Sequence, residues 1–214
     1  MAASTAAAPG APRIGLLGGS FDPPHRAHLA LGRVAREQLG LDELRWLPAG
    51  APWQKSARRL APAAHRLAML GLLVDGEPGS VVDARELRRD GPTFTIETVR
   101  ELQAERPGAQ WFLVIGQDQY RRFDSWRDWP ELLQRLTLAV AGRAGETPLA
   151  GPALAATPHR ICTLAMPRMD ISASDIRQRL AGGQDVAALV GDRVAGYIDQ
   201  NSLYQEANTE ANRH

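Results

Sequence analysis

The sequence is poor in several features that mark particular classes of protein. Its 214 residues contain a single cysteine, Cys162. An internal disulfide or a thiolate metal cluster is therefore excluded, and a reducing, cytoplasmic location is expected. No apolar run approaches the ~20 residues that a membrane-spanning helix needs, so we expect no membrane partner. The formal net charge is only +1, which gives no indication of a nucleic-acid partner.

The length is sufficient for one large domain with a sizeable core. We expect residues 1–12, "MAASTAAAPGAP", to be a disordered leader, because they lack both an apolar core of signal-peptide length and an early positive charge. Residues 13–204 are predicted to form one domain, whose last part, 170–204, is helical. Residues 205–214 are expected to form a polar tail.

Short apolar runs alternate with helical patterns along most of the chain. The predicted strands are 14–18, 44–48, 80–84, 111–116, 136–141 and 161–165, and the predicted helices between them are 26–39, 63–74, 94–105 and 129–135. The Gly-, Pro- and Ala-rich segment 142–159 is predicted to be a loop. This alternation predicts an α/β fold: a Rossmann-like parallel sheet with helices on both faces and a small helical part at the C-terminus. Ligands of such sheets lie beyond the carboxyl ends of the strands, near a switch in strand order.

The stretch "GGSFDPPHRAHL", residues 18–29, follows the first predicted strand. Gly18 and Gly19 allow a tight turn and a close approach of the backbone to a ligand. His25 and His28 lie on one face in the first turn of the next helix, where free N–H groups favour phosphate oxygens. We expect both side chains to face a solvent-filled cleft. The alternative is a glycine turn followed by two surface or capping histidines; the Gly-x-Gly-x-x-Gly and P-loop motifs are absent from the sequence.

A second short motif, "ISASDIRQRL", occupies residues 171–180. Ser172 and Asp175 have the spacing of a capping box, which predicts that a helix begins here. Arg177 is then expected in the first turn, where the helix dipole disfavours a cation unless an anion lies between the two. The alternative is an exposed arginine on an amphipathic helix.

Both motifs resemble signatures of the nucleotidylyltransferase superfamily, whose members transfer a nucleotidyl group from a triphosphate to a small phosphorylated acceptor. "GGSFDPPHRAH" resembles "GGTFDPxHxGH", with Ser20 in place of Thr and Ala27 in place of Gly. "ISASDIR" resembles "ISSTxIR", with Ala173 and Ser174 as departures. The resemblance implies three catalytic residues, His25, His28 and Arg177. It implies ATP-binding residues at Gly18, Gly19, Ser20, Phe21, Gly116, Asp118, Ser172 and Ser174.

The middle and the end of the chain resemble bacterial nicotinate mononucleotide adenylyltransferases more specifically. The matching stretches are "WQKSARRLAPAAHRLAML" (53–70), "RRDGPTFTIETV" (88–99), "WFLVIGQDQYRRFDSW" (111–126) and "VAGYIDQNSLY" (194–204). Together with the two signatures they cover most of residues 14–204 in the expected order. The implied reaction joins ATP and nicotinate mononucleotide to give deamido-NAD and pyrophosphate, a step of NAD biosynthesis.

The resemblance also implies roles for individual residues. Asp118 would accept hydrogen bonds from the adenosine ribose, Trp126 would stack on the pyridine ring, and the backbone N–H of Thr95 would bind the nicotinate carboxylate. Lys55 would approach a phosphate. Taken alone, an aspartate in this position is more often a helix cap than a ribose ligand, and an isolated tryptophan such as Trp126 is more often a core residue. Mg²⁺ would arrive with ATP, ligated mostly by phosphates and water, because no dedicated carboxylate cage is evident in the sequence.

Three other interpretations stay open at this point. An adenylyltransferase of the same fold could use nicotinamide mononucleotide or another phosphorylated acceptor. A nucleotide-sensing module without turnover is a different class, which the presence of His25, His28 and Arg177 disfavours. A nucleic-acid binder is disfavoured by the balanced charge and the scattered tryptophans. The oligomeric state is not indicated by the sequence.

Overall fold

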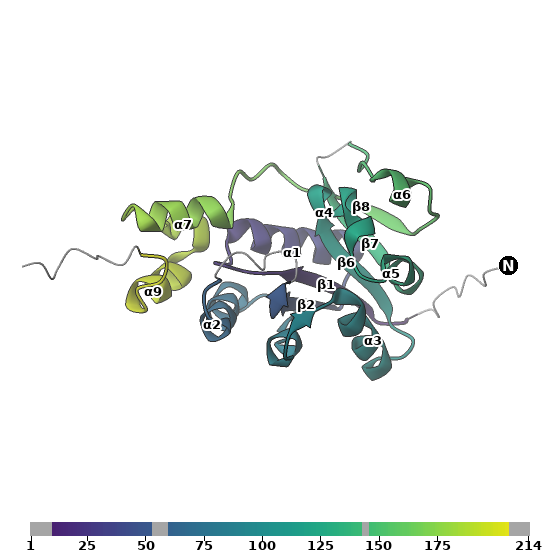
Figure 1. Ribbon diagram of the computed structural model, residues 1–214, viewed down its shortest axis with the longest axis horizontal. Helices are drawn as coiled ribbons and strands as arrows, with labels where there is room; N and C mark the ends of the chain where they lie inside the picture. The colour runs from purple at the N-terminus through teal and green to yellow at the C-terminus, as the bar shows by residue number, and fades with distance from the viewer. Residues whose placement is uncertain (1–9, 53–59, 143–145, 206–214) are drawn as a thin grey trace, which may run out of the picture.

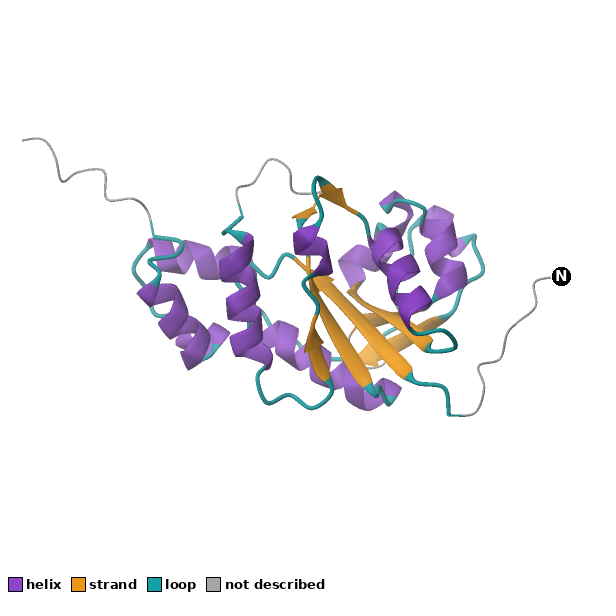
Figure 2. Cartoon of the chain, turned by 90° about the horizontal axis from the view of Figure 1, so that it is seen from below, coloured by secondary structure: helices purple, strands orange, loops and turns teal. Residues whose placement is uncertain are grey.

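A sheet of six parallel strands runs through the molecule, a computed structural model that describes residues 10–52, 60–142 and 146–205. Its strands lie in the order β4-β2-β1-β6-β7-β8 (Figures 1 and 2). They are β1 (Arg13–Gly19), β2 (Glu43–Pro48), β4 (Ser80–Val82), β6 (Gln110–Gly116), β7 (Thr137–Gly142) and β8 (Ile161–Ala165). The predicted α/β fold with a parallel sheet is confirmed.

The central strands are apolar on both faces, as parallel strands covered by helices must be. In β6, Phe112 and Val114 join one core cluster, whereas Leu113 and Ile115 join the other. Because successive strand residues point to opposite faces, this near-continuous apolar run supplies two cores at once. The run "WFLVIG" therefore identifies a buried central strand.

Helices complete a core cluster on each side. The first cluster contains residues of α1 (Arg26–Leu39), α2 (Ala63–Val74) and the C-terminal helices. The second contains residues of α3 (Thr95–Glu105), α4 (Gln117–Arg121), the 3-10 helix η3 (Phe123–Ser125) and α5 (Trp129–Arg135). Three of these helices, α1, α2 and α5, have the bounds that the sequence pattern predicts. In the part of the chain that the structure describes, no helix is long and apolar enough to cross a membrane.

The C-terminal part is helical, as expected, but consists of three pieces: α7 (Ala173–Ala181), α8 (Ala187–Val190) and α9 (Asp192–Gln200). Gly191 separates the last two with φ +90°, a backbone conformation that side chains disfavour. Buried residues of α9, Val194 and Ile198, join the core cluster that contains α1 and α2. Figure 1 shows α7 and α9 together at one end of the molecule, remote from α3 and α5.

Small elements differ from the sequence-based prediction. The segment 142–159, predicted to be a loop, contains the one-turn helix α6 (Pro152–Ala155). Proline suits the first helical position after Gly151, and the buried Leu154 anchors the turn in the core. A separate two-stranded parallel pair, β3 (Ala51–Pro52) and β5 (Pro92–Thr93), is also present; runs of two residues carry no periodicity to detect.

The strand order switches direction between β1 and β6. From β1 the chain continues to β2 on one side, whereas from β6 it continues to β7 on the other. Parallel sheets bind ligands at such a point, beyond the carboxyl ends of the two strands. Those ends are Gly19 of β1 and Gly116 of β6.

Candidate active site

The loop from Gly18 to His25, here called the signature loop, connects β1 to α1 in a conformation that its own residues hold tightly. Phe21 has φ +46°, which is rare for a residue with a side chain and costs of order 1–3 kcal/mol. Its ring is 1% exposed, and it meets the His28 ring edge-on at 5.0 Å between centroids. A Cβ on Gly19 would lie 3.2 Å from the same ring. Phe21 is therefore the core anchor of this loop.

The two histidines stand at the start of α1, with His25 as the residue before the helix and His28 as its third residue. The backbone N–H of His25 donates to Nδ1 of His28 at 3.2 Å. Because this Nδ1 is an acceptor, the proton of a neutral His28 ring is on Nε2. The two rings stack with their centroids 3.7 Å apart. The helix start thus presents a ring N–H of fixed tautomer beside its free amide groups.

His25 is buried rather than open to a cleft. It is 6% exposed, and its burial lowers its pKa from 6.5 to about 4, so the ring is neutral at physiological pH. Its Nδ1 is buried and accepts no hydrogen bond from any described residue. The expectation that both histidine side chains face a solvent-filled cleft is therefore wrong for His25, whose side chain is buried where the signature loop meets α1.

Arg177 reaches the signature loop from α7. The helix begins at Ala173, with the Ser172 hydroxyl accepting from the backbone N–H of Asp175 at 3.2 Å, so the predicted helix start is confirmed. The placement of Arg177 in the first turn is wrong, since it is the fifth helical residue, and the helix-dipole argument for an anion fails with it. The anion is nonetheless present: Nη1 of Arg177 donates to the Asp22 carbonyl and lies 3.5 Å from Oδ2 of the Asp22 carboxylate.

A buried arginine of α2, Arg66, fixes the backbone around this loop. Its guanidinium donates to the carbonyl oxygens of Ser20 and Ala49, each at 2.8 Å, and to that of Ala61 at 3.1 Å. Burial lowers the pKa of Arg66 from its ordinary value, while the nearby Asp22 opposes that shift. An arginine remains charged under such conditions, and the buried carboxylate of Asp22 lies close enough to offset part of that charge.

A cavity of about 160 Å³ opens at the switch point between β1 and β6. Gly18, Gly19 and Ser20 line it from the signature loop, and Thr95 and Trp126 line it from the opposite side. The family resemblance assigned the first three residues to ATP and the last two to the acceptor, and the structure places all five around one cavity. The remaining lining residues are Leu47, Ala49, Glu86, Thr93, Phe94, Leu113, Val114, Ile115, Gln119 and Arg127.

The far side of the cavity is aromatic and apolar. Trp126 follows η3 and rests on Phe123, with ring centroids 5.1 Å apart. Thr95 is the first residue of α3, an 11-residue helix, so its backbone N–H belongs to the unpaired helix start. The guanidinium of Arg127 lies 4.5 Å from the centre of the Phe94 ring. This side therefore combines flat apolar walls with a helix start and one exposed cation.

Glu86 contributes a buried carboxyl group to the cavity lining. It is 8% exposed and accepts a hydrogen bond from the Thr98 hydroxyl at 2.8 Å. Burial is the largest cause that raises its pKa, and the charge of Arg89 opposes this. Arg89 also donates to the Thr98 hydroxyl at 2.8 Å. The Thr98 hydroxyl of α3 thus fixes the Glu86 carboxyl group, and Arg89 fixes that hydroxyl in turn.

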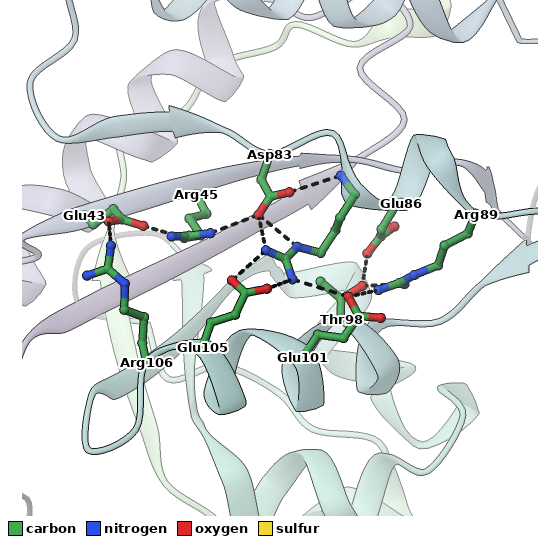
Figure 3. Close-up of polar contacts among 10 residues, drawn as sticks. Glu43, Arg45, Asp83, Glu86, Arg89, Thr98, Glu101, Glu105 and Arg106 are labelled. Carbon is green, nitrogen blue, oxygen red and sulfur yellow. Dashed lines mark hydrogen bonds and ion pairs between the residues drawn. The ribbon is translucent and has the colours of Figure 1, made fainter.

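This contact belongs to a chain of ion pairs that ties the 3-10 helix η2 (Arg85–Arg88) to α3 (Figure 3). Arg85 bonds Asp83 at 2.9 Å and Glu105 at 2.9–3.0 Å. Arg89 pairs with Glu101 at 2.7 Å. Exposed ion pairs contribute little individually, but several that share partners fix one geometry. The network sets the position of α3, and with it the position of Thr95.

The other predicted site residues do not line the cavity, and these include the three predicted catalytic residues His25, His28 and Arg177. Gly116 ends β6 and precedes α4, and Asp118 lies exposed in the first turn of α4. The hydroxyl oxygens of Ser172 and Ser174 are 3.1 Å apart at the start of α7. Lys55 is outside the described residues. Among the residues that are described, no group of three or more His, Cys, Asp or Glu side chains is arranged to hold a metal ion.

Sequence reasoning gave no role to four residues that shape the site. Asp22 lies within the motif "GGSFDPPHRAH" and Arg66 within "HRLAML". In both cases a charged residue stands next to apolar segments, and this was the only indication in the sequence that its side chain is buried. Glu86 and Arg127 offered none, because nothing in their local pattern distinguishes a cavity-lining charge from a surface charge.

A model of the cytidylyltransferase-like family matches residues 16–179, from β1 into α7. The fold and this match define the class of protein, a nucleotidyltransferase of the cytidylyltransferase-like family. A probable nicotinate-nucleotide adenylyltransferase of Methylibium petroleiphilum is 52% identical over 196 residues, which cover 90% of this chain and 92% of that protein. One of Bordetella petrii is 49% identical over 198 residues, covering 90% and 99%. The chain therefore belongs to the nicotinate-nucleotide adenylyltransferase family.

Solved structures agree on the fold. A nicotinic acid mononucleotide adenylyltransferase of Plasmodium falciparum, complexed with NaAD, superposes with a TM-score of 0.72 over 90% of this chain and 97% of its own, at 18% identity. A putative nicotinate-nucleotide adenylyltransferase of Vibrio parahaemolyticus gives a TM-score of 0.65 over 92% and 97% of the two chains, also at 18% identity.

Proposed function

We propose that this chain transfers the adenylyl group of ATP to nicotinate mononucleotide, giving deamido-NAD and pyrophosphate as a step of NAD biosynthesis. The observation that carries the proposal is the shared cavity. A glycine-rich loop beside a helix start suits a phosphate, and an aromatic wall beside a second helix start suits a flat ring that bears a carboxylate. The two meet at one switch point, within the reach of a single dinucleotide product.

The signature loop, the start of α1 and Arg177, together called the phosphate end, would hold the triphosphate. A Cβ on Gly18 would meet no described protein atom nearer than 4.0 Å, so the fold itself does not require glycine there, whereas close approach of a phosphate does. Ser20, Ser172 and Ser174 carry hydroxyls that suit phosphate oxygens. Phe21, whose ring is buried, would contribute through its backbone.

The chemistry at the phosphate end needs positioning and charge stabilisation rather than a base. The 5′-phosphate oxygen of the acceptor is already anionic, attacks the α-phosphorus of ATP in line, and displaces pyrophosphate. Nε2–H of His28 donates to oxygens around the α-phosphorus, where charge develops. His25 stacks on His28 and keeps its ring in place, while Arg177 holds the β- and γ-phosphates with its planar fork.

The remaining cavity lining, from Phe94 and Thr95 to Trp126 and Arg127, is here called the acceptor pocket. Trp126 would stack on the pyridine ring, and the Thr95 N–H would donate to the ring carboxylate. Arg127 adds a positive charge at the same side of the pocket. Asp118 and Gly116 follow β6 at the carboxyl end of the sheet, where Asp118 would accept from the adenosine ribose. Lys55 is proposed to approach a phosphate.

A divalent cation, which we propose to be Mg²⁺, would arrive as part of the ATP substrate. The side chains around the signature loop fit this arrangement, since the Asp22 carboxylate is engaged by Tyr204, Ala61 and Arg177 rather than open to a metal. Phosphate oxygens and water are the ligands that Mg²⁺ prefers in such sites. The ion would offset the charge of the leaving pyrophosphate.

The test is pyrophosphate release from ATP with a panel of acceptors: nicotinate mononucleotide, nicotinamide mononucleotide, pantetheine phosphate and glycerol phosphate. Rapid release with nicotinate mononucleotide, together with formation of deamido-NAD, is the expected result. Release only with a different acceptor would leave an adenylyltransferase of another specificity. ATP binding without release from any acceptor would favour a nucleotide-sensing module.

A further inference from the structure

Three polar residues in and beside the signature loop take no direct part in the proposed chemistry: Asp22 and Arg66, which are buried, and Tyr204, which is half-buried. Asp22 is 1% exposed, and its Oδ1 accepts from the Tyr204 hydroxyl at 2.7 Å and from the Ala61 backbone N–H at 3.1 Å. Asp22 and Tyr204 are 182 residues apart in the sequence. The last turn of the described chain is therefore bound directly to the signature loop.

The same aspartate also contacts the arginine of the phosphate end. Arg177 donates to the Asp22 carbonyl, and its Nη1 lies 3.5 Å from Oδ2 of the carboxylate. One carboxylate thus divides its two oxygens between a tyrosine hydroxyl and a guanidinium. Arg66 donates to the Ser20 carbonyl at 2.8 Å and so restrains the backbone of the signature loop. The backbone at Asp22 therefore has little freedom to shift when a contact of the Asp22 side chain is lost.

Tyr204 is suited to remain a hydrogen-bond donor at this position. Burial is the main cause that raises its pKa, and the negative charge of Asp22 raises it further. The neutral hydroxyl fixes Oδ1 of Asp22, which leaves Oδ2 directed at Arg177. Without that hydroxyl, Oδ1 keeps only the Ala61 N–H at 3.1 Å, so the carboxylate is held less firmly and can turn further toward the guanidinium, since a bidentate pair is the stronger arrangement. Arg177 would then be drawn away from the triphosphate.

We propose that Tyr204 is a positioning residue, which holds the Asp22 carboxylate so that Arg177 is oriented for the triphosphate of ATP. The proposal rests on the proposed function, in which Arg177 binds the β- and γ-phosphates. The hydroxyl touches neither substrate; it acts through Asp22.

The first experiment compares Tyr204→Phe with Tyr197→Phe. Tyr197 lies on α9, and its hydroxyl contacts Nδ1 of His65 at 3.0 Å, so this variant also loses one partly buried hydroxyl contact. For Tyr204→Phe we expect the KM for ATP to rise about 3- to 10-fold, the effect of one typical hydrogen bond, with the KM for the acceptor within twofold of wild type. Tyr197→Phe should leave both KM values unchanged. Wild-type kinetics in a folded Tyr204→Phe protein would overturn the proposal.

The second experiment is a double-mutant cycle of Tyr204→Phe and Arg177→Ala, read by calorimetric binding of ATP without acceptor. If Tyr204 acts through Arg177, the phenylalanine substitution weakens binding in the wild type but not in the Arg177→Ala protein. Equal effects in both backgrounds would overturn the proposal. Asp22→Asn keeps an acceptor for Tyr204 but removes the charge that faces Arg177, and its effect should also disappear in Arg177→Ala.

The two proposals fail in different ways. If wild-type protein binds ATP but uses no nicotinate mononucleotide, the proposed function fails, whereas the binding cycle still reports on Tyr204. If the wild type is active and the cycle is additive, the role of Tyr204 fails and the proposed function stands.

Discussion

The phosphate end and the acceptor pocket are built on opposite principles. In and beside the phosphate end, charged side chains are buried and hydrogen-bonded within the protein. Arg66 is 2% exposed and donates to backbone carbonyls, and Asp22 is 1% exposed and accepts from Ala61 N–H and the Tyr204 hydroxyl. In the acceptor pocket, the walls are aromatic, and the cation Arg127 is exposed. Buried charges with several hydrogen-bond partners restrict the phosphate end to few arrangements, whereas the aromatic walls alone accept any flat ring. In the proposed function, the phosphate end carries the reaction, and the helix start at Thr95 together with Arg127 selects among flat rings by their substituent.

The largest effect is expected at the phosphate end. His28→Ala should lower kcat by roughly two to three orders of magnitude, since one preorganised donor to developing charge contributes about 3–4 kcal/mol. Both mononucleotides should lose rate by the same factor if this end is independent of the acceptor. Steady-state kinetics check this, with His65→Ala as a matched control on α2. A folded His28→Ala protein within threefold of wild type would remove His28 from the mechanism.

A second prediction concerns the burial of His25. The pKa of His25 is about 4 in the folded protein and 6.5 ordinarily. Between these two pH values the unfolded chain is protonated at His25, whereas the folded protein is not. Stability is then complete above pH 6.5 and falls as the pH drops from 6.5 to 4, by up to roughly 3 kcal/mol. Urea unfolding at several pH values measures the slope. His25→Asn should make the slope in this window shallower, and an unchanged slope would contradict the buried, neutral ring.

Trp126→Ala should act only through the acceptor. Stacking of a ring on an aromatic side chain contributes about 1–3 kcal/mol, so the KM for nicotinate mononucleotide should rise ~10-fold while the KM for ATP stays constant. Trp129→Ala is the matched control, because Trp129 packs on the same core cluster without lining the cavity. A comparable rise in the KM for ATP would break the division between the two ends.

The smallest effect is expected for Arg127→Gln. This exposed cation pairs with Glu97 at 3.7 Å and lines the pocket near Thr95. Its loss should raise the KM for nicotinate mononucleotide a few-fold, about the magnitude of an exposed charge pair, and leave the nicotinamide form unaffected. Arg122→Gln, an exposed arginine outside the cavity lining, provides the control. An equal change for both acceptors would exclude a charge effect of Arg127 on the ring substituent.

Much of this arrangement could be predicted from the sequence, and the remainder depends on contacts between distant segments. Apolar periodicity identified β1, β6 and α1, because local patterns determine local structure. Gly18, His28, Thr95 and Trp126 were assigned to the site through the resemblance of short motifs to family signatures, and Gly18, Thr95 and Trp126 line one cavity. The pairing of Asp22 with Tyr204 could not be predicted, since no local pattern links residues 182 positions apart.

Burial of a polar group was the other property that local patterns missed. The spacing of His25 and His28 predicted a shared helix face, but neither the φ of +46° at Phe21 nor the burial of His25. The helix-dipole argument that placed an anion beside Arg177 was wrong; the anion that the structure shows there is the carboxylate of Asp22. The boundaries of the leader, the domain and the tail, a cytoplasmic location and the absence of a nucleic-acid partner remain predictions.

The most direct test of the central claim is the ratio of kcat/KM for nicotinate and nicotinamide mononucleotide in the wild-type protein. The two acceptors differ only in a carboxylate against a carboxamide. A carboxylate accepts from the helix-start amides with charge-assisted bonds, whereas a carboxamide leaves one donor unpaired at about 1–3 kcal/mol. The account predicts a preference for nicotinate mononucleotide of about two orders of magnitude, preserved in Trp126→Ala. Equal use of the two mononucleotides by the wild type would contradict it.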